Sequence, residues 1–123
     1  MKLTNLQIHT LAQAYLSAFQ NADFYLPAKV NFYIQRNSKK IIELAQDVEK
    51  ARLDIVNHYG KPVEGEEDKM AIASEDIATV NQELLDLFGI EQEIEISTFN
   101  IEALGDVKLS MEQMEAIMFM IED

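Results

Sequence analysis

Apolar residues at heptad spacing fill the stretch between Pro27 and Gly60, and this pattern constrains the fold more than any other feature of the chain. Two interleaved series with members seven residues apart form the apolar side: Ile34, Ile41, Val48 and Ile55, and Val30, Asn37, Leu44 and Ala51. Such a seam predicts one long helix over residues 28–59. Pro27 suits the start of this helix and Gly60 suits its end.

Asn37 is a polar residue within this apolar seam. A buried asparagine at a heptad position often fixes the register or the oligomeric state of a coiled coil. The same side chain could instead bond a loop backbone inside the monomer. Asn37 is therefore a candidate residue for setting the register of an oligomer, with the intramolecular role as the alternative.

Three further helices are indicated by their capping residues and apolar periodicity. Thr4 and Gln7 form a potential capping box that predicts a helix over residues 5–20. Ser74 as N-cap and Gly89 as C-cap predict a helix over 75–88. A second capping box, made by Ser110 and Gln113, predicts a C-terminal helix over 111–122.

The apolar period changes from helical to alternating beyond Gly89. In "EQEIEIS", Ile94 and Ile96 alternate with glutamates, which predicts a half-buried strand. We expect an antiparallel hairpin between 92–97 and 106–109, with a third short strand at 69–73. The sequence "KPVEGEEDK" predicts a charged, flexible loop over 60–69. The chain of 123 residues is thus expected to be a single, predominantly helical α+β domain over 1–123.

The last fourteen residues, "SMEQMEAIMFMIED", contain four of the six methionines. At 100° per residue, one stripe is expected to face the core: Met111, Met114, Ile117, Met118 and Ile121. Phe119 and Met120 fall outside this stripe. They belong either to the core, if another helix covers them, or to a surface that binds a partner or a second copy.

The charge is concentrated in the second half of the chain. The formal net charge is −12, and residues 61–123 alone carry −14. Such a chain repels phosphate backbones and anionic lipids, so we expect no nucleic acid and no membrane as partners, despite a basic and aromatic patch in residues 29–40. A protein with a basic surface is the expected partner, and Glu91, Glu93 and Glu95 on one strand face are candidate contacts.

Residues that commonly carry chemistry are scarce. The chain has no cysteine, which excludes disulfides, thiolate metal sites and a cysteine nucleophile. Its two histidines lack further ligands at metal-binding spacing, and its four glycines form no phosphate-binding loop. We therefore expect no catalytic residue, cofactor or metal site. Without a long apolar run or a signal-like start, the expected location is the cytoplasm.

Four segments carry a resemblance to a known family: "LTNLQIHTLAQAY", "YLPAKVNFYIQRN", "NQELLDLFGIEQEIEI" and "LGDVKLSMEQMEAIMFMIE". The chain resembles a family of small uncharacterised proteins encoded by phages and prophages of Gram-positive bacteria. The resemblance implies a viral origin and action in the cytoplasm of the host bacterium.

The leading hypothesis is a non-enzymatic interaction factor whose acidic surface binds a host or phage protein, with a host-defence or takeover protein as one candidate target. One alternative is a virion-assembly or structural accessory protein that self-associates, for example as a homodimer. The other alternative is a small enzyme or nucleotide-binding module.

Overall fold

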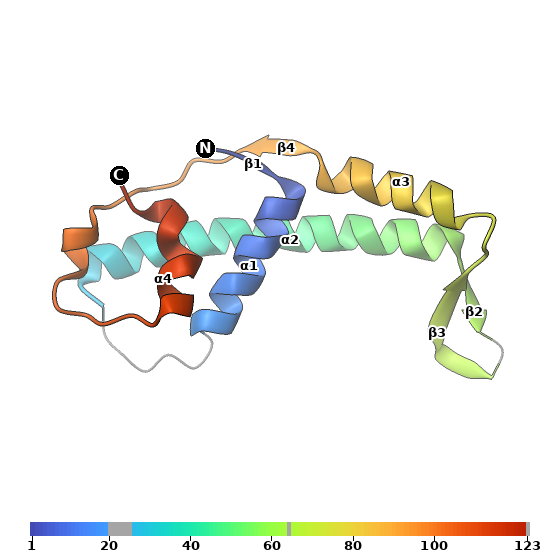
Figure 1. Ribbon diagram of the computed structural model, residues 1–123, viewed down its shortest axis with the longest axis horizontal. Coiled ribbons are helices and arrows are strands. Elements are labelled where there is room, and N and C mark those ends of the chain that lie inside the picture. Colours follow the sequence, from blue (N-terminus) through green and yellow to red (C-terminus); the bar gives the residue numbers. More distant parts are fainter. Residues whose placement is uncertain (20–25, 64, 123) are drawn as a thin grey trace.

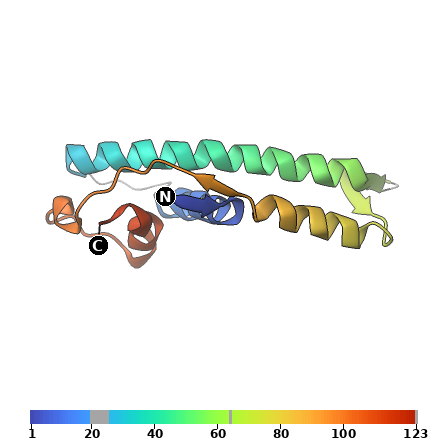
Figure 2. The same cartoon turned by 90° about the horizontal axis from the view of Figure 1, so that it is seen from above.

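One long helix forms the axis of the molecule. The computed structural model of the chain describes residues 1–19, 26–63 and 65–122. Helix α2 (Ala28–Tyr59) runs along almost the whole length of the protein (Figure 1), as the heptad seam predicts. Helices α1, α3 and α4 all lie on the same side of α2 (Figure 2). The protein is therefore a predominantly helical α+β domain with two layers.

Helix α1 (Asn5–Phe19) crosses α2 near its middle (Figure 1). The predicted capping box is confirmed, because the Thr4 N–H donates to Gln7 Oε1 at 2.8 Å and the Gln7 N–H donates to Thr4 Oγ1 at 3.1 Å. Two orphan N–H groups of the first turn are thereby satisfied. Ile8 and Ala12 are buried on the side that faces α2.

A short antiparallel pair joins the two halves of the sequence. Strand β4 (Glu91–Glu93) pairs with β1 (Lys2–Thr4), and the Ile94 N–H donates to the Met1 carbonyl at 2.8 Å. The predicted hairpin between 92–97 and 106–109 is therefore wrong. The alternation of isoleucine and glutamate is right, since Ile94 is buried and Glu93 and Glu95 are exposed. Alternation defines which face is buried, but it does not identify the partner strand.

A second hairpin follows the end of α2. Strands β2 (Gly60–Val63) and β3 (Glu66–Ile72) pair in antiparallel register from Gly60 with Ile72 to Val63 with Glu66. Residues 60–63 and 66–69 are therefore strands and not the expected loop, and residue 64 lies outside the described residues. Gly65 adopts a φ of 85°, which a glycine reaches without steric cost, and this conformation allows the chain to reverse between the strands.

Helix α3 (Ile77–Phe88) runs antiparallel to the C-terminal part of α2 (Figure 1). It starts two residues later than predicted, because residues 74–76 form a turn in which the Asp76 N–H donates to the Ala73 carbonyl at 2.9 Å. Ser74 is therefore not the N-cap. The predicted end is confirmed, since the Gly89 N–H donates to the Leu85 carbonyl.

The C-terminal segment contains α4 (Met111–Ile117) and the 3₁₀ turn η2 (Met118–Met120). The capping box of Ser110 and Gln113 is confirmed. The predicted helix over 111–122 is too long, because the winding tightens after Ile117. A 3₁₀ turn repeats every three residues, so Met120 lies on the same side as Ile117 and is fully buried.

Two of the methionines assigned to the core lie on the surface instead. Met118 follows Ile117 directly, points about 100° away from it and is 55% exposed. Met111 is also exposed. The predicted core stripe is wrong at these two positions.

Two clusters of buried residues form the core beside the N-terminal part of α2. One cluster joins α2 to the C-terminal segment, with these buried members: Leu26, Val30, Ile34, Phe99, Leu104, Ile117 and Met120. The second joins α2 to α1, to β1 and to the residue that follows β4: Leu3, Ile8, Ala12, Ile41, Ala45 and Ile94. A short 3₁₀ helix, η1 (Ile101–Leu104), contributes Leu104. None of the described helices has the length and apolar character to span a membrane.

Candidate protein-binding surfaces

An acidic groove lies between α2 and the strand segment 92–95. Its volume is about 350 Å³, and eight residues line it: Lys40, Glu43, Leu44, Asp47, Gln92, Glu93, Ile94 and Glu95. Glu93, the last residue of β4, and Glu95, just beyond it, are both exposed, whereas Ile94 between them is buried. Glu43 and Asp47 are four residues apart on α2 and therefore share one face of the helix. Four carboxylates and one ammonium group thus surround the groove.

Local bonds neutralise this groove only in part. The Lys40 Nζ donates to the backbone carbonyl of Glu95 at 2.8 Å, and the Met1 amino group lies 3.1 Å from Glu93 Oε1. The carboxylates of Glu43, Asp47 and Glu95 have no ion-pair partner among the residues that the structure describes. Their negative charge is available to a cationic group from another molecule.

The carboxylates surround the groove but do not converge on one point. Within residues 1–19, 26–63 and 65–122, no three acidic or histidine side chains are placed to hold a metal ion. Separated carboxylates on two walls are instead suited to lysine or arginine side chains, which bond carboxylates individually or in pairs. The groove therefore offers separate negative charges from its two walls.

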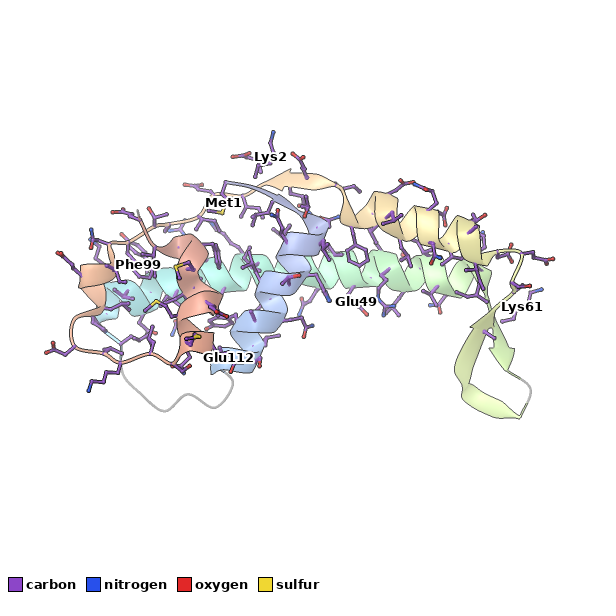
Figure 3. All side chains as sticks on the ribbon, in the orientation of Figure 1. Met1, Lys2, Glu49, Lys61, Phe99 and Glu112 are labelled. Atoms are coloured by element: carbon purple, nitrogen blue, oxygen red, sulfur yellow. The ribbon has the colours of Figure 1, made fainter. Side chains whose placement is uncertain are left out.

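The three candidate glutamates differ in position. Glu93 and Glu95 line the groove, whereas Glu91 lies outside it, 3.8 Å from the Lys2 Nζ. Figure 3 shows Lys2 projecting from β1 away from the body of the molecule.

Sequence reasoning missed the wall of the groove that α2 forms. The signal for it was the pair Glu43 and Asp47 at helical spacing, beside the seam residue Leu44.

Phe119 and Met120 have different environments. Met120 is a fully buried member of the core, so it cannot contact a partner. Phe119 is partly buried and lines a second groove of about 390 Å³ beside α1, together with Leu3, Leu6, Gln7, Thr10 and Leu11. The walls of this groove contain no charged residue. Of the two candidates, Phe119 alone can contribute to a binding surface.

Asn37 bonds a loop inside the monomer. It is fully buried, its Nδ2 donates to the Ser97 carbonyl at 2.7 Å, and its Oδ1 accepts the Ser97 N–H at 2.9 Å. Both polar atoms of the amide are therefore satisfied by the segment that follows β4. The intramolecular alternative is correct, and Asn37 does not set the register of an oligomer.

A basic strip occupies the outer side of α2 near its N-terminus. Phe32, Arg36 and Lys39 line a shallow hollow of about 270 Å³ with Gln35, and the Lys29 Nζ lies 5.9 Å from the centre of the Tyr33 ring. No acidic residue lies between Ala28 and Ile42. The molecule thus carries a small cationic area as well as the acidic groove.

The strongest ion pair of α2 is a structural contact within one helix. The Arg52 guanidinium donates to both Glu49 oxygens, at 2.9 Å and 2.6 Å (Figure 3 labels Glu49). This hydrogen bond lowers the pKa of Glu49 and raises the pKa of Arg52. The charge of His9, which lines the same hollow as Glu49, also lowers the pKa of Glu49. Ion pairs at the spacing of Glu49 and Arg52 commonly stabilise exposed helix surfaces.

Comparison of the chain with protein-family models, with curated proteins and with solved structures finds no match.

Proposed function

We propose that the protein is a non-enzymatic interaction factor whose acidic groove binds a basic segment of another protein. The observation that supports this proposal is that two segments distant in sequence line one groove with carboxylates, Glu43 and Asp47 from α2 and Glu93 and Glu95 from residues 92–95. Leu44 and Ile94 also line the groove and offer apolar contact to the aliphatic stems of lysine and arginine.

The partner is proposed to be a host or phage protein in the cytoplasm of a bacterium. Support comes from the resemblance of the chain to small phage and prophage proteins, together with its net charge of −12. A strongly acidic surface accelerates association with basic partners and disfavours phosphate-rich ones. A host-defence or takeover protein with an exposed lysine- or arginine-rich segment fits this chemistry.

The proposal is tested with a groove variant that combines Glu43→Gln, Asp47→Asn and Glu95→Gln. The matched control combines Glu102→Gln, Asp106→Asn and Glu115→Gln, which changes the net charge equally at exposed positions outside the groove. Wild type and both variants are used to capture partners from a bacterial lysate at low salt. The affinity for any recovered protein is then measured by calorimetry at several salt concentrations.

We expect the groove variant to bind at least about tenfold more weakly than the control, because several charge-assisted contacts are lost together. Binding of the wild type should also weaken as salt is raised. Equal binding by the two variants would contradict the proposal. Capture of no protein at low salt would do the same.

A structural role through self-association is favoured by a separate feature, the exposed outer side of α1. This surface carries leucine, glutamine and threonine side chains but no Asp, Glu, Lys or Arg.

A further inference from the structure

Helix α1 lies in a stretch without charged residues. Residues 3–22 contain no Asp, Glu, Lys or Arg, although 26% of the whole chain is charged. A helix that only faces water normally carries charges on its outer side. On α1 the outer positions are instead Leu6, which is 54% exposed, Leu16, which is 47% exposed, and the exposed Gln7, Thr10 and Gln13. This outer side is called the α1 ridge.

The α1 ridge is flanked by a groove on each side. One is the apolar groove of about 390 Å³ that Leu3, Leu11 and Phe119 line. The other is a hollow of about 200 Å³ between α1 and α2, lined on the α1 side by His9, Ala12, Gln13 and Leu16. A ridge between two grooves is the surface that packs against another helix, because the ridge of each helix enters a groove of the other.

No other described element covers the α1 ridge on the side away from α2 (Figures 1 and 2). This agrees with the exposure of Leu6, Gln7, Thr10 and Gln13. The ridge is accessible to a second molecule.

The charge distribution selects a second copy of the chain as the occupant. Two molecules of net charge −12 repel each other over most of their surfaces. The exposed Leu85 of α3 is an example of a site where two copies would repel each other. It neighbours Asp86, and no lysine or arginine occurs between residues 70 and 107. The α1 ridge itself carries no Asp, Glu, Lys or Arg, so two copies can meet there without opposing like charges on the ridge. Of the residues that the structure describes, Glu49 is the one acidic residue that lines the two flanking grooves, and Arg52 pairs with it.

The order of residues along the α1 ridge is also self-complementary. Leu6 and Leu16 lie near opposite ends, with Thr10 and Gln13 between them. Leu6 lines one flanking groove and Leu16 the other. In an antiparallel pair, the end of the ridge that carries Leu6 would lie beside the end that carries Leu16 of the partner subunit, and the two-fold symmetry would repeat this contact. The central threonine and glutamine side chains can hydrogen-bond across the axis.

We propose that two copies of the protein associate through antiparallel contact of their α1 ridges. Helix α1 has 15 residues and spans about 22 Å. One such helix with its flanking grooves offers less than the roughly 800 Å² per partner of a standard interface. The dimer is therefore weak and forms as the protein concentration rises.

Sedimentation equilibrium over a wide concentration range, at low and high salt, tests the proposal. Wild type should dimerise, and salt should strengthen the dimer because it screens the repulsion between the two acidic molecules. Leu6→Glu should weaken association at least about tenfold, since the dimer would then bury one new carboxylate from each subunit in an uncharged contact. Leu85→Glu on α3, which is 68% exposed in the wild type, is the matched control and should leave the dimer intact.

Leu6→Glu is not expected to unfold the protein. Leu6 is exposed, and a carboxylate in the first turn of a helix interacts favourably with the helix dipole. Circular dichroism checks this. A wild type that stays monomeric at all concentrations, a dimer that survives Leu6→Glu, or a dimer that salt dissociates would each overturn the proposal.

Disulfide cross-linking provides a second measurement, because the chain contains no cysteine of its own. Thr10→Cys lies near the centre of the proposed contact, so mild oxidation should give a covalent dimer rapidly. Thr79→Cys, at an exposed position of α3, should cross-link only at the rate of random collision. Equal rates for the two variants would argue against the α1 contact.

Discussion

Around the N-terminal part of α2 the chain packs α1, α4 and the segment 94–104, whereas around the C-terminal part it packs α3 and a hairpin. We call the first region the packed end, residues 1–48 and 90–122, and the second the arm, residues 49–89. Both buried clusters lie in the packed end. Among the described side chains of the arm, Val80 is the one buried apolar residue.

The arm packs fewer elements against α2 than the packed end does. Its two antiparallel helices can cover each other on one side only, so Leu53, Ile77 and Leu85 remain exposed. The packed end covers one side of the same helix with segments from both ends of the sequence (Figures 1 and 2). Burial, and with it the free energy of unfolding, is therefore distributed unevenly along α2.

The largest difference between the regions is expected from truncation of a buried side chain. Met120→Ala should lower the free energy of unfolding by about 2–5 kcal/mol, because it removes a fully buried side chain and leaves a cavity. Leu85→Ala in the arm should change it by less than about 0.5 kcal/mol, since Leu85 is exposed. Urea unfolding measures both values. Equal effects would remove the distinction between packed end and arm.

A smaller effect is expected where the packed end depends on a polar contact. Asn37→Ala should cost about 1–3 kcal/mol, because the N–H and the carbonyl of Ser97 lose their partners in a partly buried place. Ser38→Ala is the matched control. The Ser38 Oγ is buried and has no hydrogen-bond partner among the described residues, so its removal should be neutral or slightly stabilising.

Urea unfolding of these two variants decides whether the contact between α2 and the segment after β4 stabilises the fold. If Ser38→Ala destabilised the protein more than Asn37→Ala, the role assigned to Asn37 would be wrong.

The smallest effect concerns a contact of the arm. Partial burial raises the pKa of Tyr59, and the charge and hydrogen bond of the Glu83 carboxylate raise it further. Since the folded pKa lies above the unfolded value, the contribution of Tyr59 to stability is present below about pH 10 and is lost as the pH rises through the folded pKa. The contact between α2 and α3 should therefore weaken in alkaline solution.

Spectrophotometric titration of phenolate absorbance tests this prediction. The difference between wild type and Tyr59→Phe isolates the titration of Tyr59, and its midpoint should lie above the ordinary value for tyrosine. Glu83→Gln should lower the midpoint, and Glu115→Gln, which lies on α4 in the packed end, should not. A midpoint that does not respond to Glu83→Gln would mean that Tyr59 and Glu83 do not interact.

Local features of the fold were predictable from the sequence. The bounds of α2 and both capping boxes depend on residues within a few positions of each other, and the structure confirms them. The start of α3 was not predictable in this way. Ser74 suggested an N-cap, but residues 74–76 form a turn. The candidate binding site was half predictable. The strand placed Glu93 and Glu95 outward, but their position opposite Glu43 and Asp47 depends on how two distant segments pack.

The sequence by itself determined where the helices form, since a hydrogen bond of a helix spans four residues and a cap spans three. Only the tertiary structure decided that β4 pairs with β1 instead of residues 106–109, and that Met120 is buried while Met118 is exposed. These outcomes depend on contacts between residues far apart in the chain. Such contacts form wherever the whole molecule buries the most apolar surface, and no local pattern encodes that choice.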